Sequence, residues 1–224
     1  MSKRRRVILW VCFGLLIVLV GAVAGLYWAS QYVPEFYRRA LEIDAEDPGQ
    51  RELSGQMVQG AMDLVSAVKK KRHWDTQFTA EQINAWLAVD MPRKHKELVP
   101  PNFEAPRVAI EQEQMAVACR FRHGSFTTVL TLTVKPYLSA AEPNVLAVEI
   151  CKARAGRLPL PLKSVLDEIS AAAAQANVQL RWRYVGGSPV VQITLPEPQD
   201  SGRLVWIDAL DLEEGRIRVA GRTE

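Results

Sequence analysis

The sequence is poor in the residues that build metal and catalytic centres. Its 224 residues include 3 cysteines and 3 histidines, and they contain neither a Cys-x-x-Cys nor a His-x-x-x-His spacing. A Gly-x-Ser-x-Gly nucleophile elbow and a phosphate-binding glycine loop are missing as well. We therefore expect a protein that is not an enzyme, with no catalytic residues, no cofactor and no metal.

Negative charge is missing from the start of the chain, where no acidic residue precedes Glu35. The basic residues at positions 3–6 alone exceed the formal net charge of +3, so the rest of the chain is close to neutral. A nearly neutral domain lacks the excess of basic residues that binds the phosphates of DNA or RNA, and we expect no nucleic acid partner. Basic runs at 69–72 and 93–96 are typical of a solvated helix end and loop, with contact to anionic lipid headgroups as the alternative.

One long hydrophobic run extends from Val7 to Ala29 without a charged residue. As a helix of about 1.5 Å per residue it covers roughly 34 Å, enough to cross a hydrocarbon core of about 30 Å. Trp10, Tyr27 and Trp28 lie near its ends, where amphipathic rings prefer the headgroup level, and the basic prefix predicts a cytoplasmic N-terminus. The sequence thus predicts a single-pass protein of the cell membrane, with a cytoplasmic tail at 1–6, a transmembrane helix at 7–29, a juxtamembrane segment at 30–48 and an extracytoplasmic α+β domain at 49–224.

A cleaved signal peptide is the alternative to an anchor. Ala22-Val23-Ala24 fits the small-x-small pattern of a cleavage site, which would leave a mature chain that begins at Gly25. The arginine cluster also raises export by the twin-arginine route. The apolar run continues past Ala24 and is longer than a typical signal-peptide core, which favours an uncleaved anchor. In either case the folded part is predicted to lie outside the cytoplasm.

Two cysteines lie beyond the hydrophobic run, Cys119 and Cys151. An oxidising compartment would permit a disulfide between them. Strand alternation, however, places Cys119 on the apolar face of its strand and Cys151 beside Glu149. Two small buried thiols are the favoured interpretation.

The remaining polar candidates are explained by ordinary structure. His73, His95 and His123 adjoin charged residues at a predicted helix end, a loop and a turn, which favours exposed structural roles over catalysis. An acidic cluster at a predicted hairpin tip is typical of a solvated turn, with weak cation binding as the alternative: Asp208, Asp211, Glu213 and Glu214.

Helical spacing follows the hydrophobic run in a short amphipathic piece at 36–43 and in three longer segments. Thr79 and Gln82 form the pattern of a capping box for a helix that ends near Val89. Its predicted buried side chains are Ile83, Trp86 and Leu87. The prolines at 159 and 161 are predicted to open a helix that ends near Asn177. The helix predicted at 49–72 carries an apolar stripe of Leu53, Met57, Ala61, Leu64, Val65 and Val68.

Alternating apolar and polar residues predict the strands. They lie at 74–78, 108–110, 115–122, 125–135 and 145–152, and two hairpins that turn at 186–187 and 213–215 finish the chain. The prolines between Met91 and Pro106 predict an irregular loop. The fold class is therefore α+β, with one domain of curved antiparallel sheet packed on two or three helices.

The predicted sheet is long for the helices available to cover it, and four tryptophans beyond the hydrophobic run need cover or a partner. Ordinary core is one interpretation. The other is a sheet that curls around the helices and leaves an apolar groove able to hold an acyl chain. The candidate lining residues are Trp86, Leu130, Leu132, Leu162, Val165, Leu166 and Ile169.

Two motifs resemble known envelope proteins. The segment from Phe78 to Leu87 resembles the Thr-x-x-Gln-hydrophobic-Asn-x-x-Leu segment of small anchored bacterial domains. The passage from Val148 to Pro161 resembles the strand, Gly-x-Leu-Pro-Leu-Pro, helix passage of the YpmS-like family. The resemblance covers about residues 75–195 and implies one N-terminal transmembrane helix, an extracytoplasmic α+β domain and, by analogy with related-looking domains, a curved sheet that wraps a helix and binds lipid. It carries no catalytic residue.

We therefore expect a non-catalytic, membrane-anchored envelope module. The leading hypothesis is that it binds lipid or another apolar ligand in the groove. The alternative is a structural or assembly protein that docks another envelope protein through an apolar surface. A hydrolase with an unrecognised site is the third hypothesis.

Overall fold

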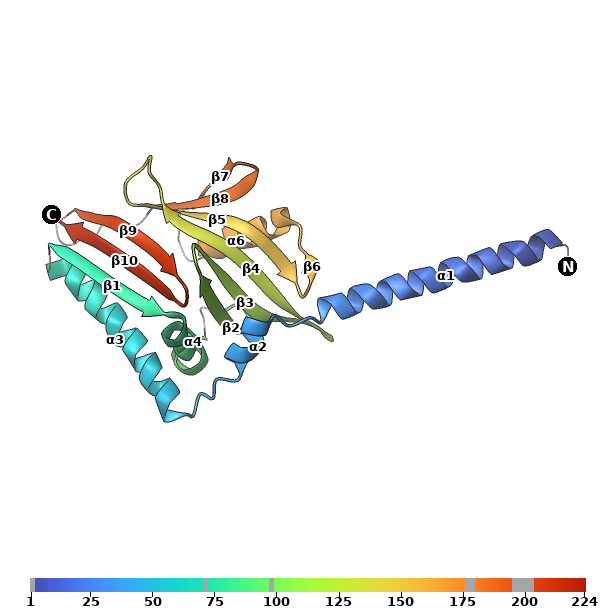
Figure 1. Ribbon diagram of the computed structural model, residues 1–224, viewed down its shortest axis with the longest axis horizontal. Coiled ribbons are helices and arrows are strands. Elements are labelled where there is room, and N and C mark those ends of the chain that lie inside the picture. The colour runs from blue at the N-terminus through green and yellow to red at the C-terminus, as the bar shows by residue number, and fades with distance from the viewer. Residues whose placement is uncertain (1–2, 71, 97–98, 176–179, 195–203) are drawn as a thin grey trace.

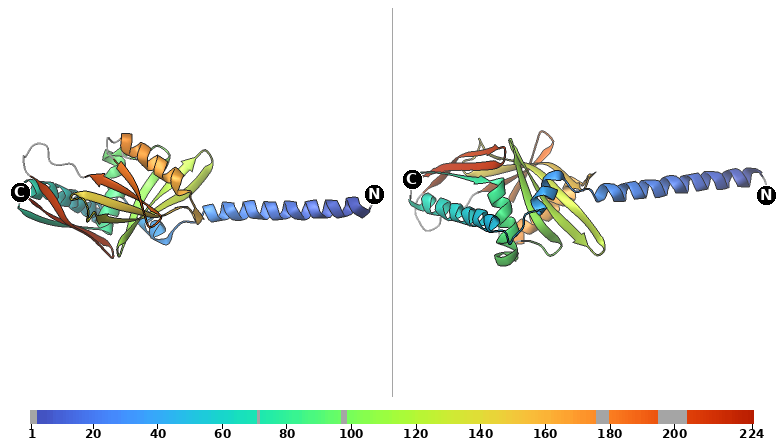
Figure 2. Two further views of the ribbon diagram at one scale, coloured as in Figure 1. Left: turned by 90° about the horizontal axis from the view of Figure 1, so that it is seen from above. Right: turned by 60° about the horizontal axis from the view of Figure 1, so that its bottom comes forward.

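A long N-terminal helix, α1 (Lys3–Ser30), projects from an α+β body in this computed structural model (Figure 1). The structure describes residues 3–70, 72–96, 99–175, 180–194 and 204–224. The strands of the body form two antiparallel sheets, and the C-terminus lies at the end of the body farthest from α1 (Figures 1 and 2).

The larger sheet has seven strands and is curved (Figure 2). Its order is β2 (Phe103–Glu111), β3 (Gln114–His123), β4 (Phe126–Leu138), β5 (Val145–Ala155), β8 (Ser188–Thr194) and β7 (Leu180–Val185), and the short β6 (Leu158–Pro159) pairs with β5. The register shifts between Glu104 and Arg107 and between Thr133 and Val134. Such bulges add an unpaired residue and bend the strand, which contributes to the curvature.

The smaller sheet has the order β1 (His73–Thr79), β10 (Arg216–Thr223) and β9 (Val205–Glu213). Its inner face turns toward helix α3 (Pro48–Lys70), where the ring of Phe78 lies against Gly60. Its outer face carries charged side chains paired across the strands, among them Arg218 with Asp75 and Asp211. One face is therefore apolar and the other solvated, as in a sheet covered on one side.

Five α-helices follow α1 in the described residues, more than the two or three predicted: α2 (Glu35–Leu41), α3, α4 (Ala80–Val89), α5 (Met91–Lys94) and α6 (Leu162–Gln175). The predicted single sheet is likewise divided in two. The coarser prediction, an α+β fold with a curved antiparallel sheet, is confirmed.

The capping box of α4 is formed as predicted. The Thr79 hydroxyl accepts a hydrogen bond from the Gln82 amide at 3.1 Å, and the Gln82 side chain accepts one from the Thr79 amide at 3.0 Å. The buried face differs from the prediction, because Asn84, Ala85 and Val89 are buried while Ile83, Trp86 and Leu87 are half-buried. The reason is that α4 packs Asn84 against the edge of β2, which helical spacing cannot show.

The predicted apolar stripe of α3 is wrong in part. Ala61 and Val65 are exposed, whereas Ser54 is fully buried. Helix α3 packs on α4 and β1 through the side that includes Ser54, whose hydroxyl donates to the Asp90 carboxylate at 2.5 Å. A buried polar residue with a half-buried partner therefore replaces part of the expected apolar face.

Two strands and one helix also depart from the predicted boundaries. Strand β2 begins at Phe103, because Pro106 lies at a bulge on the edge of the sheet, where proline is tolerated. Residues Leu158 and Pro159 pair with β5 instead of opening a helix, so α6 begins at Leu162. The predicted helix end near Asn177 lies outside the described residues.

The uncharged run lies within α1, but the structure gives only weak support for a membrane span. From Gly14 onward, where side chains are described, no single helix is long and apolar enough to cross a membrane. The part of α1 from Gly14 to Ser30 and α2 reach that length and composition only together, with a bend of 52° between them. Because α2 buries Tyr37 in the body, its apolar side faces protein.

Candidate functional site

Four of the seven predicted groove residues come together where α6 crosses the curved sheet. Leu132, Leu162, Leu166 and Ile169 pack around Val134 of β4 and Ile150 of β5. Ile150 is 2% exposed and Leu166 is 9% exposed, so side chains fill the centre of this interface. At this cluster α6 packs directly on the strands that the groove hypothesis placed opposite it.

The other three predicted residues lie apart from that cluster. Leu130 is half-buried on β4 opposite Cys119, and Val165 is half-buried on α6. Trp86 is on α4, where its ring lies against His95 with centroids 5.9 Å apart. The half-buried Trp86 side chain is therefore covered in part by a residue near its own helix and not by the α6 cluster.

A hydrogen-bond chain fixes α6 to the edge of the large sheet. The indole of Trp182 on β7 donates to the Ser170 hydroxyl at 2.9 Å, and Ser170 donates to the Leu166 carbonyl one turn earlier at 2.7 Å. The Trp182 ring also packs on the apolar cluster. This tryptophan has a structural role that supports ordinary core over an open groove.

The first motif of the resemblance has a structural explanation. Asn84, which follows the capping box, donates its amide to the Val108 carbonyl at 2.8 Å and accepts from the Val108 amide at 2.9 Å. The side chain thus pairs with the edge strand β2 as a neighbouring strand would. It joins α4 to the large sheet.

The junction between α1 and the body is held by specific backbone contacts. The last carbonyls of a helix lack partners within the helix. Here the Arg157 amide donates to the Ala29 carbonyl at 2.9 Å, and the Thr128 hydroxyl donates to the Ser30 carbonyl at 2.6 Å. The body therefore supplies the cap of α1, and Ser30 itself is only 4% exposed.

Gly156 allows this close approach. A Cβ atom at this position would lie 2.5 Å from the carbonyl oxygens of both Ala29 and Ser30, and the backbone has a φ of +59°. Any residue with a side chain would be strained here, because it would lack space and because its backbone would have to adopt a positive φ. Next to it, the Arg157 guanidinium lies over the Tyr32 ring, 4.2 Å from the centroid.

Helix α2 extends the junction across the sheet. Tyr37 is fully buried against Ala118 and Val129, and its hydroxyl donates to the Ala105 carbonyl at 2.9 Å. Arg107 reaches back and donates to the Ala40 carbonyl at 2.9 Å. Burial raises the pKa of Tyr37 and lowers that of Arg107, so the tyrosine is neutral in this site. Helix α2, within the segment predicted as juxtamembrane, is thus packed on the body.

A cavity of about 100 Å³ lies beneath this junction. It is much smaller than the roughly 300–1,000 Å³ of sites that hold small molecules. An acyl chain does not fit within it. Its lining combines a cation and several polar groups with apolar side chains: Gln31, Val33, Tyr37, Leu41, Arg120, Thr127, Thr128 and Val129.

The charged clusters are paired. Arg216, Arg218 and Arg222 form ion pairs with Glu213, Asp211 and Asp208, respectively, which favours a solvated face over a cation site. Within the described residues no group of three or more histidine, cysteine or acidic side chains could hold a metal ion.

The two cysteines are free and half-buried, in agreement with the interpretation as thiols. Burial raises the pKa of Cys119 to about 11, and burial is also the main cause of the raised pKa of Cys151. Since the thiolate is the nucleophile, neither cysteine is activated.

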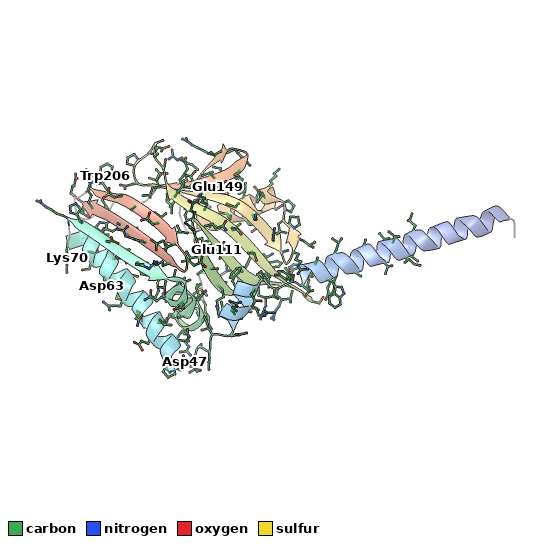
Figure 3. All side chains as sticks on the ribbon, viewed as in Figure 1. Asp47, Asp63, Lys70, Glu111, Glu149 and Trp206 are labelled. Atoms are coloured by element: carbon green, nitrogen blue, oxygen red, sulfur yellow. The ribbon has the colours of Figure 1, made fainter. Side chains whose placement is uncertain are left out.

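The basic runs have partners or lie far from α1. Arg93 pairs with Glu46, and Lys94 pairs with Asp90 at 2.6 Å. Together with Ser54, Lys94 lowers the pKa of Asp90. Lys70, in the other run, lies at the end of the body opposite to α1 (Figure 3) and is not beside that helix.

Comparisons with models of known families, with curated proteins and with solved structures find no match. The resemblance to the YpmS-like family therefore stays a prediction from two motifs. The geometry of the α1 junction and of the α6 interface carries the functional argument.

Sequence reasoning did not identify the junction. Its members, Ser30, Tyr37, Thr128 and Gly156, are separated by up to 126 positions and share no local pattern. The one local signal was Gly156, which opens the Gly-x-Leu-Pro-Leu-Pro motif.

Proposed function

We propose that this protein is a non-catalytic, single-pass membrane module that holds its body in a fixed orientation outside the cell membrane for docking to another envelope protein. In this proposal α1 spans the membrane with its N-terminus in the cytoplasm. The observation that carries it is the α1 junction, where two helix carbonyls accept hydrogen bonds from the body at 2.9 and 2.6 Å. A flexible tether needs no such contacts.

The surfaces available for docking lie away from the junction. Met62 and Val65 on α3 are 61% and 55% exposed, and Tyr184 and Val185 on β7 are 71% and 56% exposed. Exposed apolar side chains that are adjacent in space mark interaction surfaces more often than isolated ones do. The filled interface under α6 supports this proposal over an apolar ligand site.

Crosslinking in intact cells tests the docking proposal. A photoreactive amino acid is placed at Val65 and, in a second variant, at Tyr184; the control position is Asp63, which is exposed on the same helix as Val65. One discrete protein adduct at Val65 or Tyr184, absent at Asp63, is the expected result. Adducts at neither apolar position would contradict the proposal.

Binding of an apolar ligand is the second candidate, because most members of the α6 cluster are only partly buried. Displacement of α6 from the sheet would expose this cluster to a lipid. Mass spectrometry of lipids that co-elute with the purified full chain tests it. A stoichiometric lipid that is lost in Ile169→Asp but kept in Lys163→Asp would favour this candidate, and lipid-free protein would exclude it.

A further inference from the structure

We infer that the hairpin between β3 and β4 is a second membrane contact, which inserts the Phe126 ring into the headgroup region of the bilayer that holds α1. The inference rests on the proposed membrane location of α1. It assigns a partner, the lipid surface, to a part of the body that the groove hypothesis did not consider.

The position of the hairpin follows from its contacts with α1. Thr128 donates to the Ser30 carbonyl at 2.6 Å, and the Gln31 side chain donates to the Thr127 carbonyl at 3.0 Å. Phe126 is two residues from Thr128, or about 7 Å along a strand. Trp28 precedes Ser30 by two residues, or about 3 Å along a helix. The hairpin tip therefore lies close to the C-terminal end of α1.

The figures agree with this estimate. In all three views the β3–β4 hairpin reaches the C-terminal end of α1 along the axis of that helix (Figures 1 and 2). The small sheet and the C-terminus lie at the opposite end of the body. Because the junction fixes α1 to the body, a membrane around α1 meets this hairpin before the small sheet.

The side chains at this level suit a membrane interface. Tyr27, Trp28, Tyr32 and Phe126 are 58%, 79%, 38% and 41% exposed, although large rings are usually covered in a folded body. Aromatic rings are enriched at the headgroup level, and the exposed Arg157 guanidinium over Tyr32 can pair with lipid phosphate. The tip between His123 and Phe126 contains Gly124 with a φ of +59°, a tight turn that leaves Phe126 at the start of β4.

Tryptophan substitution in the full chain, reconstituted in phosphatidylcholine–phosphatidylglycerol liposomes, tests the contact. Phe126→Trp places a fluorophore at the tip, and Val65→Trp is the matched control at an exposed apolar position on α3. Emission added by F126W is expected to shift to the blue and to be quenched by lipids brominated on the upper acyl chain. Emission added by V65W is expected to do neither, and equal behaviour of the two variants would overturn the inference.

A second measurement uses the unaltered chain, so that it does not depend on the folding of a variant. Lipids with a photoreactive acyl chain are activated in the same liposomes, and the adducts are mapped by mass spectrometry. Adducts are expected on α1 and on the peptide that contains Phe126, and none on α3. Adducts confined to α1 would refute the hairpin contact but leave the tether intact, whereas a chain that does not float with liposomes would refute both.

Discussion

The two ends of the body are stabilised in different ways. At the end next to α1, buried groups hold specific partners: Tyr37 bonds to a backbone carbonyl, and Gly156 leaves space for two others. At the far end, the buried Thr223 hydroxyl donates to the Val68 carbonyl of α3 at 2.8 Å, but the outer face of the small sheet presents exposed ion pairs and α3 leaves apolar side chains uncovered. Buried, directional contacts fix an orientation, whereas exposed ion pairs contribute little to stability. The end next to α1 is therefore fixed to that helix, whereas the outer surface of the far end stays accessible.

The largest effect is expected from Tyr37→Ala. Removing this fully buried ring leaves a cavity between α2 and the large sheet and an unpaired Ala105 carbonyl. The cost should be about 4 kcal/mol of the free energy of unfolding, as for other buried aromatic side chains. Urea unfolding of the full chain in detergent measures it, with Val65→Ala on α3 as the far-end control. A similarly small loss of stability in both variants would contradict the proposed difference between the two ends of the body.

Gly156→Ala should rank second. Its Cβ would meet two backbone carbonyls at a positive φ, which we expect to cost about 3 kcal/mol. Gly124→Ala is the matched control, because it has the same φ of +59° and no atom within 4 Å of the added carbon. Its loss should be about 1 kcal/mol, from conformation alone. Equal losses of stability in the two variants, measured by thermal or urea unfolding, would show that the end of α1 does not lie close to Gly156.

Asn84→Ala should have an intermediate effect. It removes both hydrogen bonds to Val108 and leaves a buried amide and carbonyl without partners. We expect a loss of about 2 kcal/mol. Hydrogen exchange of the β2 amides should accelerate locally in this variant. Unchanged exchange at Val108 would contradict the role of Asn84 as a substitute strand.

Arg218→Ala should have the smallest effect, although it removes ion pairs to both Asp75 and Asp211. All three side chains are about half exposed, so solvent screens the charges. We expect no measurable change in the midpoint of unfolding. A loss comparable to that of Asn84→Ala would show that the far end is held by its ion pairs.

Local signals predicted most of the elements but few of their contacts. Thr79 and Gln82 predicted the capping box because both partners lie within one turn of helix. Alternation predicted the strands, because neighbouring side chains in a strand face opposite sides. The hydrogen-bond partners of Asn84 and Tyr37 could not be predicted, since they are the carbonyls of Val108 and Ala105, which lie 24 and 68 positions away in the sequence.

The errors have the same physical origin. Leu158 and Pro159 extend the sheet only because the end of β5 lies beside them. Val65 is exposed although it lies on nearly the same side of α3 as the buried Ser54, eleven residues earlier, so burial along this helix depends on what packs beside each turn. Four of the seven groove residues meet in one apolar cluster, but whether such residues contact each other or a ligand depends on tertiary packing.

A distance measurement between α1 and the body tests the central claim most directly. Spin labels carried by unnatural amino acids at Leu19 and Asp63, both exposed, would be measured by pulsed electron resonance in lipid nanodiscs. The α1 junction predicts one narrow distance distribution, which broadens in Gly156→Ala but not in Gly124→Ala. A broad distribution in the unaltered chain would show that α1 is a flexible tether and would contradict the fixed orientation.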